Sequence, residues 1–195
     1  MKPKLIGTLS FLILLGCQSA SGLIDHDGNI YPTAKYGETI WMMANLKVRH
    51  DRSGNQVVYY SPNEDTSNIK IYGLLYDYAT ACEVCPEGWR LPTNPEWENL
   101  FQLSEQNKAG KYKDREFWEG ETNSNSCNFS VRPAGLGNNG EYQNHFGDKT
   151  LFWSATKDGE HFIWTFILEK GKDSIRIASQ HPTYAFSVRC VKNSD

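Results

Sequence analysis

The C-terminal part of the sequence alternates apolar and polar side chains over short runs separated by turn-forming residues. In the run 161–168, Phe162, Trp164 and Phe166 fall on one side of an extended chain and the intervening residues on the other. Successive side chains of a β-strand point to opposite faces of a sheet, so this period of two predicts strands joined as an antiparallel meander. The runs that we expect to be strands are 151–155, 161–168, 174–178 and 185–191.

A helix start signal lies in the middle of the chain. Thr93 and Glu96 have the spacing of a capping box, and Pro95 stands in the first turn, where proline is favoured. Apolar residues then recur at helical spacing, which predicts a helix over 94–106 with one buried face. The residues expected on that face are Trp97, Leu100 and Phe101.

The remaining segments complete the expected fold class. The apolar run 69–81 fits a strand followed by a helix, with the break near Gly73, and 50–68 and 107–150 are polar enough to be long loops. We therefore expect an α+β fold with an antiparallel sheet, one or two helices and long loops.

The composition of the chain indicates a folded domain and argues against one class of partner. The 195 residues include 20 Lys and Arg against 23 Asp and Glu, a formal net charge of −3, and 13% of them are aromatic. A chain this rich in aromatic residues can build the core of a single domain. Because it has no excess of basic residues, we expect no nucleic-acid partner.

The N-terminus has the organisation of an export signal. Lys2 and Lys4 precede an almost wholly apolar run, 5–15. This run is too short to span a bilayer, which takes roughly 20 residues, but it fits the apolar region of a secretory signal. It ends in LLGC at 14–17, which resembles the bacterial lipobox, whose cysteine becomes the acylated first residue of the mature protein. An ordinary cleaved signal with an incidental cysteine is the alternative.

The lipobox resemblance implies a membrane-anchored protein. Residues 1–16 would be the signal peptide, Cys17 the lipidation site, 17–24 a tether and 25–192 a single domain. Stable anchoring takes more than one acyl chain, and lipoprotein processing supplies several, palmitate among them. We therefore expect the membrane as a partner, and a location in the cell envelope as an outer-membrane lipoprotein, on its periplasmic or its surface face.

The other cysteines suit an exported protein. Cys82, Cys85, Cys127 and Cys190 form an even set, which favours disulfides over free thiols, with three possible pairings. The C-x-x-C spacing of the first two also admits a redox or a zinc site. A redox motif would open a helix, whereas PEG follows here at 86–88, and a zinc ribbon would need a second C-x-x-C. We expect structural disulfides.

Residues 25–29, DHDGN, alternate acidic residues in a way that faintly suggests a calcium loop. An EF-hand needs Gly at position 6 and Glu at position 12, but Gly28 stands at position 4 and Tyr36 at position 12. A hairpin turn built on Asp27 and Gly28 explains the pattern better, and we expect no metal site.

Motifs of catalysis are missing from the sequence. It contains neither H-E-x-x-H nor G-x-S-x-G, and no glycine-rich phosphate loop. Glu116, Glu119 and Glu121 cluster around Trp118, but such clusters are usually solvated, and a glycosidase needs two carboxylates at a fixed separation. We expect no enzyme activity and no cofactor.

Aromatic residues within the polar loops are the candidate binding residues. They are Trp118, Phe129, Tyr142 and Phe146. Aromatic faces beside Asn, Asp and Glu would suit a sugar or a protein surface. The alternative is that these side chains pin the loops onto the core.

Short segments spread over the chain resemble one family, the Fibrobacter succinogenes major paralogous domain, from about residue 25 to 192. They are IWMMANL at 40–46, YGLLY at 72–76 with ATA at 79–81, CPEGWRLPT at 85–93 with EW at 96–97, RPAG at 132–135, FWSAT at 152–156 and FSVRCV at 186–191. The family counterparts are WMAENL, YGxLYxxxxA, CPxGWxLPTxxEW, PAG, FWSST and FSVRCV, in the same order.

This resemblance implies a C-type-lectin-like fold. In that fold a cysteine beside an early helix bonds one in the last strand, which would pair Cys85 with Cys190 and leave Cys82 and Cys127 for a second bridge. The tripeptides through which C-type lectins bind sugar with calcium do not occur here. The reactive cysteines of the related formylglycine-generating enzymes have no counterpart either, because all four are assigned to disulfides.

The sequence therefore favours a non-catalytic lipoprotein binding module of the cell envelope, with a glycan or another envelope protein as its ligand. Two alternatives stay open. One is an enzyme that acts on glycans, and the other is a structural or adhesion protein without a small ligand.

Overall fold

The computed structural model describes residues 19–102, 109–137 and 144–193. Within these ranges the strands form two sheets, ordered β1-β2-β3-β9 and β4-β8-β5-β6-β7. The strands are β1 (Ser19–Ile24), β2 (Ile30–Tyr36), β3 (Thr39–Met42), β4 (Leu75–Tyr76), β5 (Lys149–Asp158), β6 (Phe162–Glu169), β7 (Arg176–Gln180), β8 (Phe186–Ser187) and β9 (Val191–Asn193). The helices are α1 (Ile69–Tyr72), α2 (Tyr78–Glu83) and α3 (Asn94–Gln102), with 3₁₀ turns η1 (Pro62–Glu64), η2 (Thr66–Asn68) and η3 (Ala109–Lys111). The α+β fold class is confirmed.

The four-stranded sheet joins the two ends of the described chain. β1 runs antiparallel to β2, and the last strand, β9, pairs with β3, so that Trp41 lies opposite Val191. Residues 17–24 were expected to be a tether, and the structure differs there, since a strand begins at Ser19 and pairs with β2. The folded unit therefore starts earlier than the sequence pattern indicated.

The five-stranded sheet contains the predicted meander. β5, β6 and β7 are antiparallel neighbours, as the period of two indicated. The expected strand 185–191 is broken in two, because β8 pairs with β4 and β5 while β9 crosses to the other sheet. Between them the carbonyls of Val188 and Cys190 accept hydrogen bonds from the backbone N–H groups of Leu46 (2.9 Å) and Met42 (3.0 Å).

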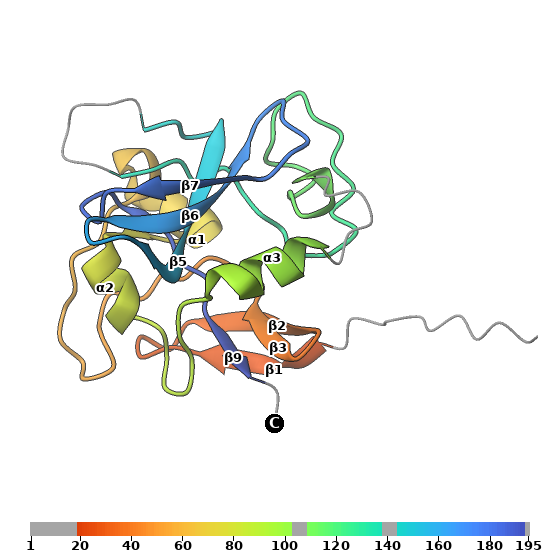
Figure 1. The fold of residues 1–195 in the computed structure, drawn as a ribbon. Helices are drawn as coiled ribbons and strands as arrows, with labels where there is room; N and C mark the ends of the chain where they lie inside the picture. Colours follow the sequence, from red (N-terminus) through yellow and green to blue (C-terminus); the bar gives the residue numbers. More distant parts are fainter. Residues whose placement is uncertain (1–18, 103–108, 138–143, 194–195) are drawn as a thin grey trace, which may run out of the picture.

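Helix α3 begins at Asn94, as predicted, and lies between the two sheets (Figure 1). The Glu96 carboxylate accepts a hydrogen bond from the Thr93 N–H at 2.8 Å, as a capping box requires. Trp97 is fully buried, with ring centroids 4.7 Å from Trp41 on β3 and 5.2 Å from Phe152 on β5. One tryptophan thus joins both sheets, and the expected helix end at residue 106 lies outside the described residues.

The run 69–81 was expected to be a strand followed by a helix, and the order in the structure is different. Helix α1 comes first, then Gly73, then the short strand β4 and helix α2. Gly73 has φ +79°, and a Cβ there would lie 2.6 Å from the Cβ of Asn45 and 2.8 Å from the carbonyl oxygen of Leu46. Only glycine fits this close approach, which ends α1 and starts β4.

One disulfide ties the segment after α2 to the segment before β9. Cys85 and Cys190 are both fully buried and bonded, with a Cα–Cα distance of 5.8 Å. The expected second bridge is not formed. Cys82 is exposed on α2, whereas Cys127 packs against the aromatic cluster that contains Trp97, and neither takes part in a disulfide.

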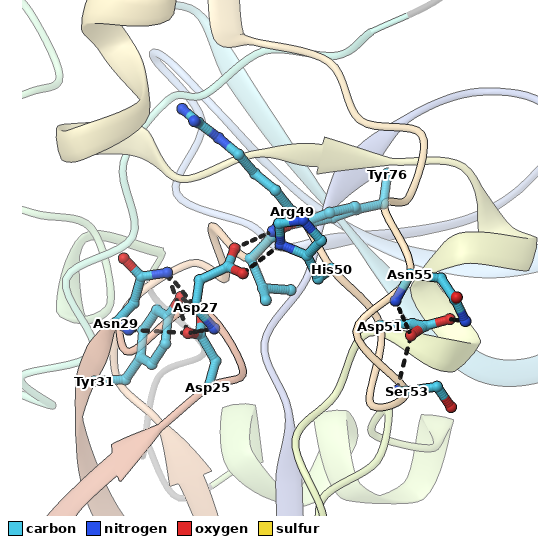
Figure 2. A network of polar contacts seen from close by, with 11 residues as sticks. Asp25, Asp27, Asn29, Tyr31, Arg49, His50, Asp51, Ser53, Asn55 and Tyr76 are labelled. Carbon is cyan, nitrogen blue, oxygen red and sulfur yellow. Dashed lines mark hydrogen bonds and ion pairs between the residues drawn. The ribbon is translucent and has the colours of Figure 1, made fainter.

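Residues 25–29 form the predicted hairpin turn, between β1 and β2 (Figure 2). The Asp25 carboxylate accepts hydrogen bonds from the backbone N–H groups of Asp27 (3.0 Å) and Asn29 (2.9 Å) and from the Tyr31 hydroxyl (2.6 Å). Residues 51–55, DRSGN, repeat this turn, with Asp51 accepting from the N–H groups at positions 53 and 55. In both turns the first carboxylate therefore serves the backbone of its own turn.

The two turns are linked by one short contact. His50 lies just before the second turn, and its Nδ1 is 2.5 Å from Oδ1 of Asp27 in the first. The other oxygen of Asp27 accepts from the backbone N–H of Arg49 at 2.6 Å. Burial raises the pKa of Asp27, but the Arg49 N–H and the His50 ring outweigh it and hold that pKa below its usual value. Polar contacts therefore hold the two turns together.

Candidate ligand-binding cleft

Trp118 was expected on a binding surface, and that expectation is wrong, because its side chain is 1% exposed. Its Nε1 donates a hydrogen bond to the carbonyl of Val131 at 2.8 Å, and the Lys113 ammonium lies 4.4 Å from the centre of its ring. Lys113 is itself buried and pairs with Glu121, Nζ to Oε2, at 2.7 Å. Trp118 therefore pins its loop onto the core.

Phe129 is also buried, so its assignment to a binding surface is wrong too. Its ring packs edge-on against Trp41, with centroids 5.8 Å apart, and the guanidinium of Arg189 lies 4.2 Å from its centre. Phe146 is half-buried and packs edge-on against Tyr72 at 4.8 Å. Tyr142 lies outside the described residues.

The glutamates near Trp118 do not form a pair of free carboxylates. Glu121 binds Lys113, and Glu119 lies 3.2 Å from Nζ of Lys170. Burial raises the pKa of Glu121, but the hydrogen bonds from Lys113, the Gly171 N–H and Asn123, together with the charge of Lys113, outweigh it, and the net pKa is lower than usual. A carboxyl group with a lowered pKa stays ionised at neutral pH and is a poor proton donor.

A cleft of about 230 Å³ opens on the five-stranded sheet. Leu151, Ile167 and Arg176 lie side by side across β5, β6 and β7, because Leu151 pairs with Ile167 and Ile167 with Arg176. These three residues line the cleft, whereas the alternate residues Phe152 and Phe166 pack on α3. The sheet thus has one face in the core with α3 and one face that carries the cleft.

The floor of the cleft is apolar and has an aromatic wall. Leu151, Ile167 and Phe186 are nearly fully buried beneath it. Tyr184 is half-buried and stacks on Phe186, with ring centroids 6.0 Å apart and planes 17° from parallel. A stacked tyrosine at the edge of a concave surface offers a flat face on which an apolar ring face of a ligand can pack.

The rim of the cleft is basic. Lys149 and Arg176 lie 3.5 Å and 3.2 Å from the same oxygen of Glu169. Burial raises the pKa of Glu169, but the hydrogen bond and charge of Arg176 and the charge of Lys149 outweigh it, so its pKa lies below the usual value. Two cations share one carboxylate, which leaves one positive charge in excess beside the apolar floor.

Leu136 and two further polar side chains, His145 and Gln180, complete the lining. His145 comes from the long loop that was expected to bind a ligand, and it is half-buried there. The other histidines, His26, His50, His161 and His181, lie in turns or at the surface. The cleft therefore combines an aromatic face, an amide, an imidazole and a net positive charge, a set that suits a hydroxylated ligand carrying an anionic group.

Sequence reasoning did not find Lys149, Arg176, Gln180 or Tyr184. The sequence signal for the first three is their position in the period of two, since Lys149 shares a face with Leu151, and Arg176 shares one with Gln180. The register of the strands decides which of these side chains lie together on one face of the sheet. Contacts between residues far apart in the chain determine that register.

Two kinds of feature are absent from the described ranges, 19–102, 109–137 and 144–193. No helix there is long and apolar enough to cross a membrane. No group of three or more His, Cys, Asp or Glu side chains in these ranges is arranged to hold a metal ion.

The fold and the cleft define a small, disulfide-tied α+β domain with a preformed surface cleft. The model of one family, the Fibrobacter succinogenes major domain, matches residues 34–192. The chain belongs to that family. No curated protein and no solved structure matches it.

Proposed function

We propose that this protein is a non-catalytic binding module of the cell envelope, and that its ligand is a glycan with acidic sugars. The observation that carries the proposal is the cleft, in which Tyr184 stands over an apolar floor beside Lys149 and Arg176. Sugars stack their apolar faces on aromatic rings, and a cationic rim selects a carboxylated sugar over a neutral one.

The proposed anchor is the lipid on Cys17. Cys17 lies two residues before β1, which starts at Ser19, so little chain would separate the acyl chains from the folded domain. A domain tethered this closely would work at the membrane surface, on ligands that the envelope itself displays.

The non-catalytic assignment is supported by the acidic side chains. Glu119, Glu121 and Glu169 are each held in an ion pair with lysine or arginine. A glycosidase instead needs one carboxyl group that keeps its proton near neutral pH and faces a second carboxylate across the sugar.

The decisive test is binding of the full-length, oxidised protein to uronate-containing oligosaccharides and to matched neutral ones. We expect Tyr184→Ala to weaken binding of both kinds of oligosaccharide about fivefold, since an aromatic stacking contact is worth about 1 kcal/mol. The double variant Lys149→Gln, Arg176→Gln should weaken binding of the uronate-containing oligosaccharides only. Lys157→Gln, an exposed lysine on β5 outside the cleft, is the matched control and should have no effect.

The outcomes separate the candidate functions. Loss of binding in EDTA would indicate a calcium-dependent lectin, and conversion of any bound glycan into products would indicate an enzyme. If no glycan binds, either with calcium or with EDTA, the proposed ligand is overturned. An envelope protein as the ligand, or a structural role, is then favoured. The anchor is tested separately, by palmitate labelling and by release of Cys17→Ser from the membrane fraction.

A further inference from the structure

One arginine of the segment between β8 and β9 is buried. Arg189 is 1% exposed, and its three hydrogen bonds all go to neutral acceptors. Nε donates to the side-chain carbonyl of Asn45 at 2.9 Å, and the two Nη atoms donate to the backbone carbonyls of Phe129 and Ser130. A guanidinium has five N–H donors, so within the described residues two of them are left without an acceptor.

The charge of Arg189 is not neutralised by the described residues. None of their carboxylates lies within ion-pair distance of it, because Asp114, an acidic group close enough to affect Arg189, pairs with Nε of Arg132 at 3.0 Å. Two arginines thus face one aspartate. Burial lowers the pKa of Arg189 to about 9, which reflects the cost of keeping a cation away from water. At neutral pH the group is still charged.

A cavity of about 210 Å³ adjoins this charge and is separate from the cleft. Its polar lining is Arg189, Arg132, Asn45 and Ser130, and its apolar lining is Pro32, Met43, Ala44 and Ile71. Three segments that resemble the family, 40–46, 132–135 and 186–191, meet here. A pocket with a cationic end and an apolar body fits a small amphiphilic anion.

We propose that this cavity binds a small monocarboxylate with a short apolar body. The carboxylate would take the place of the missing counter-ion beside Arg189 and Arg132, and the apolar body would contact Met43, Ala44 and Ile71. A carboxylate accepts paired hydrogen bonds from guanidinium groups, which a neutral amide cannot replace. The chemistry is shared by free organic acids and by the C-terminus of a peptide. This site is independent of the glycan cleft.

The test compares acids with their uncharged analogues on the full-length protein. Hexanoate and benzoate represent free acids, and N-acetyl-Ala-Leu represents a peptide C-terminus; each is paired with its amide and titrated by NMR into the millimolar range. We expect an acid to bind at least about tenfold more tightly than its amide, the difference of a charge-assisted contact. Whichever acid binds more tightly identifies the source of the ligand.

The variants avoid Arg189 itself, whose loss would disturb the core. Arg132→Gln removes one cation from the cavity lining. It should weaken binding of the acid about tenfold and leave binding of the amide unchanged. Ala44→Leu should fill the cavity and abolish binding of both. Arg115→Gln is the control, because Arg115 is exposed and does not line the cavity. Near-UV circular dichroism checks that each variant is folded.

Equal binding of acid and amide, or binding of neither, would overturn the proposal. So would acid binding that survives Ala44→Leu in a folded protein, because the anion would then sit elsewhere. The oligosaccharide binding test concerns the cleft on the five-stranded sheet and uses different variants. The failure of one proposal therefore leaves the other standing.

Discussion

The Cys85–Cys190 bond should supply a large part of the stability of the fold. It joins residues 105 positions apart, and in the chain-entropy model a loop of about 100 residues restricts the unfolded chain by about 4.7 kcal/mol at 25 °C. Removing the bond with Cys85→Ala and Cys190→Ala together, or by reduction, should therefore lower the free energy of unfolding by up to about 4.7 kcal/mol. This is a large share of the roughly 5–15 kcal/mol typical of domains.

Urea unfolding of the full-length protein measures this loss. With a slope of about 2 kcal/mol per molar urea, the midpoint should fall by about 2 M. The matched control is Cys82→Ala with Cys127→Ala, which should shift the midpoint only slightly, since neither residue is in a disulfide. A drop of less than about 0.5 M for the first pair would refute the reasoning. An equal drop for the control pair would show a second bridge.

The other predictions concern the core, the helix start and pH. Trp118→Ala should lower the free energy of unfolding, measured in urea, by about 3–5 kcal/mol, because the side chain is buried. A variant that loses glycan binding but keeps the wild-type free energy of unfolding would contradict this. Glu96→Ala should cost about 1 kcal/mol in the same assay by removing the acceptor of the Thr93 N–H at the start of α3, and an unchanged midpoint would contradict it. Glu96, Glu121 and Glu169 have folded-state pKa values below the usual 4.5, so their stabilisation is present above about pH 4.5 and is lost as the pH falls through those values. Stability measured against pH should thus drop on acidification, and the triple Gln variant should show a shallower drop.

The local pattern of the sequence predicted the parts of the fold that local chemistry determines. The period of two in 161–168 identified β6, and the capping box at Thr93 located the start of α3. The segment 185–191 reads as one strand, but its two ends pair in different sheets. That break comes from backbone hydrogen bonds to Leu46 and Met42, more than a hundred residues earlier, and no local pattern contains it.

The candidate binding residues were harder to predict, because composition does not tell whether a loop aromatic faces solvent or the core. Trp118 lies among charged residues in the sequence, yet Lys113 covers its ring and Glu121 neutralises that lysine inside the protein. Conversely, Tyr184 stands in an unremarkable turn but reaches the cleft because Phe186, two residues later, anchors it.

The segment 186–191 links the disulfide to both cavities, through different residues. Phe186 forms part of the cleft floor and is held by β4 and β5, whereas Arg189 lines the second cavity and is followed directly by Cys190. Sheet pairing therefore positions Phe186 in the cleft, whereas Arg189 in the second cavity is next to the residue that is bonded to Cys85. A short stretch near the C-terminus thus contributes a residue to each of the two proposed binding sites. Each site draws most of its remaining residues from a different part of the chain: the cleft from β5, β6 and β7, and the cavity from the segments around Asn45 and Arg132.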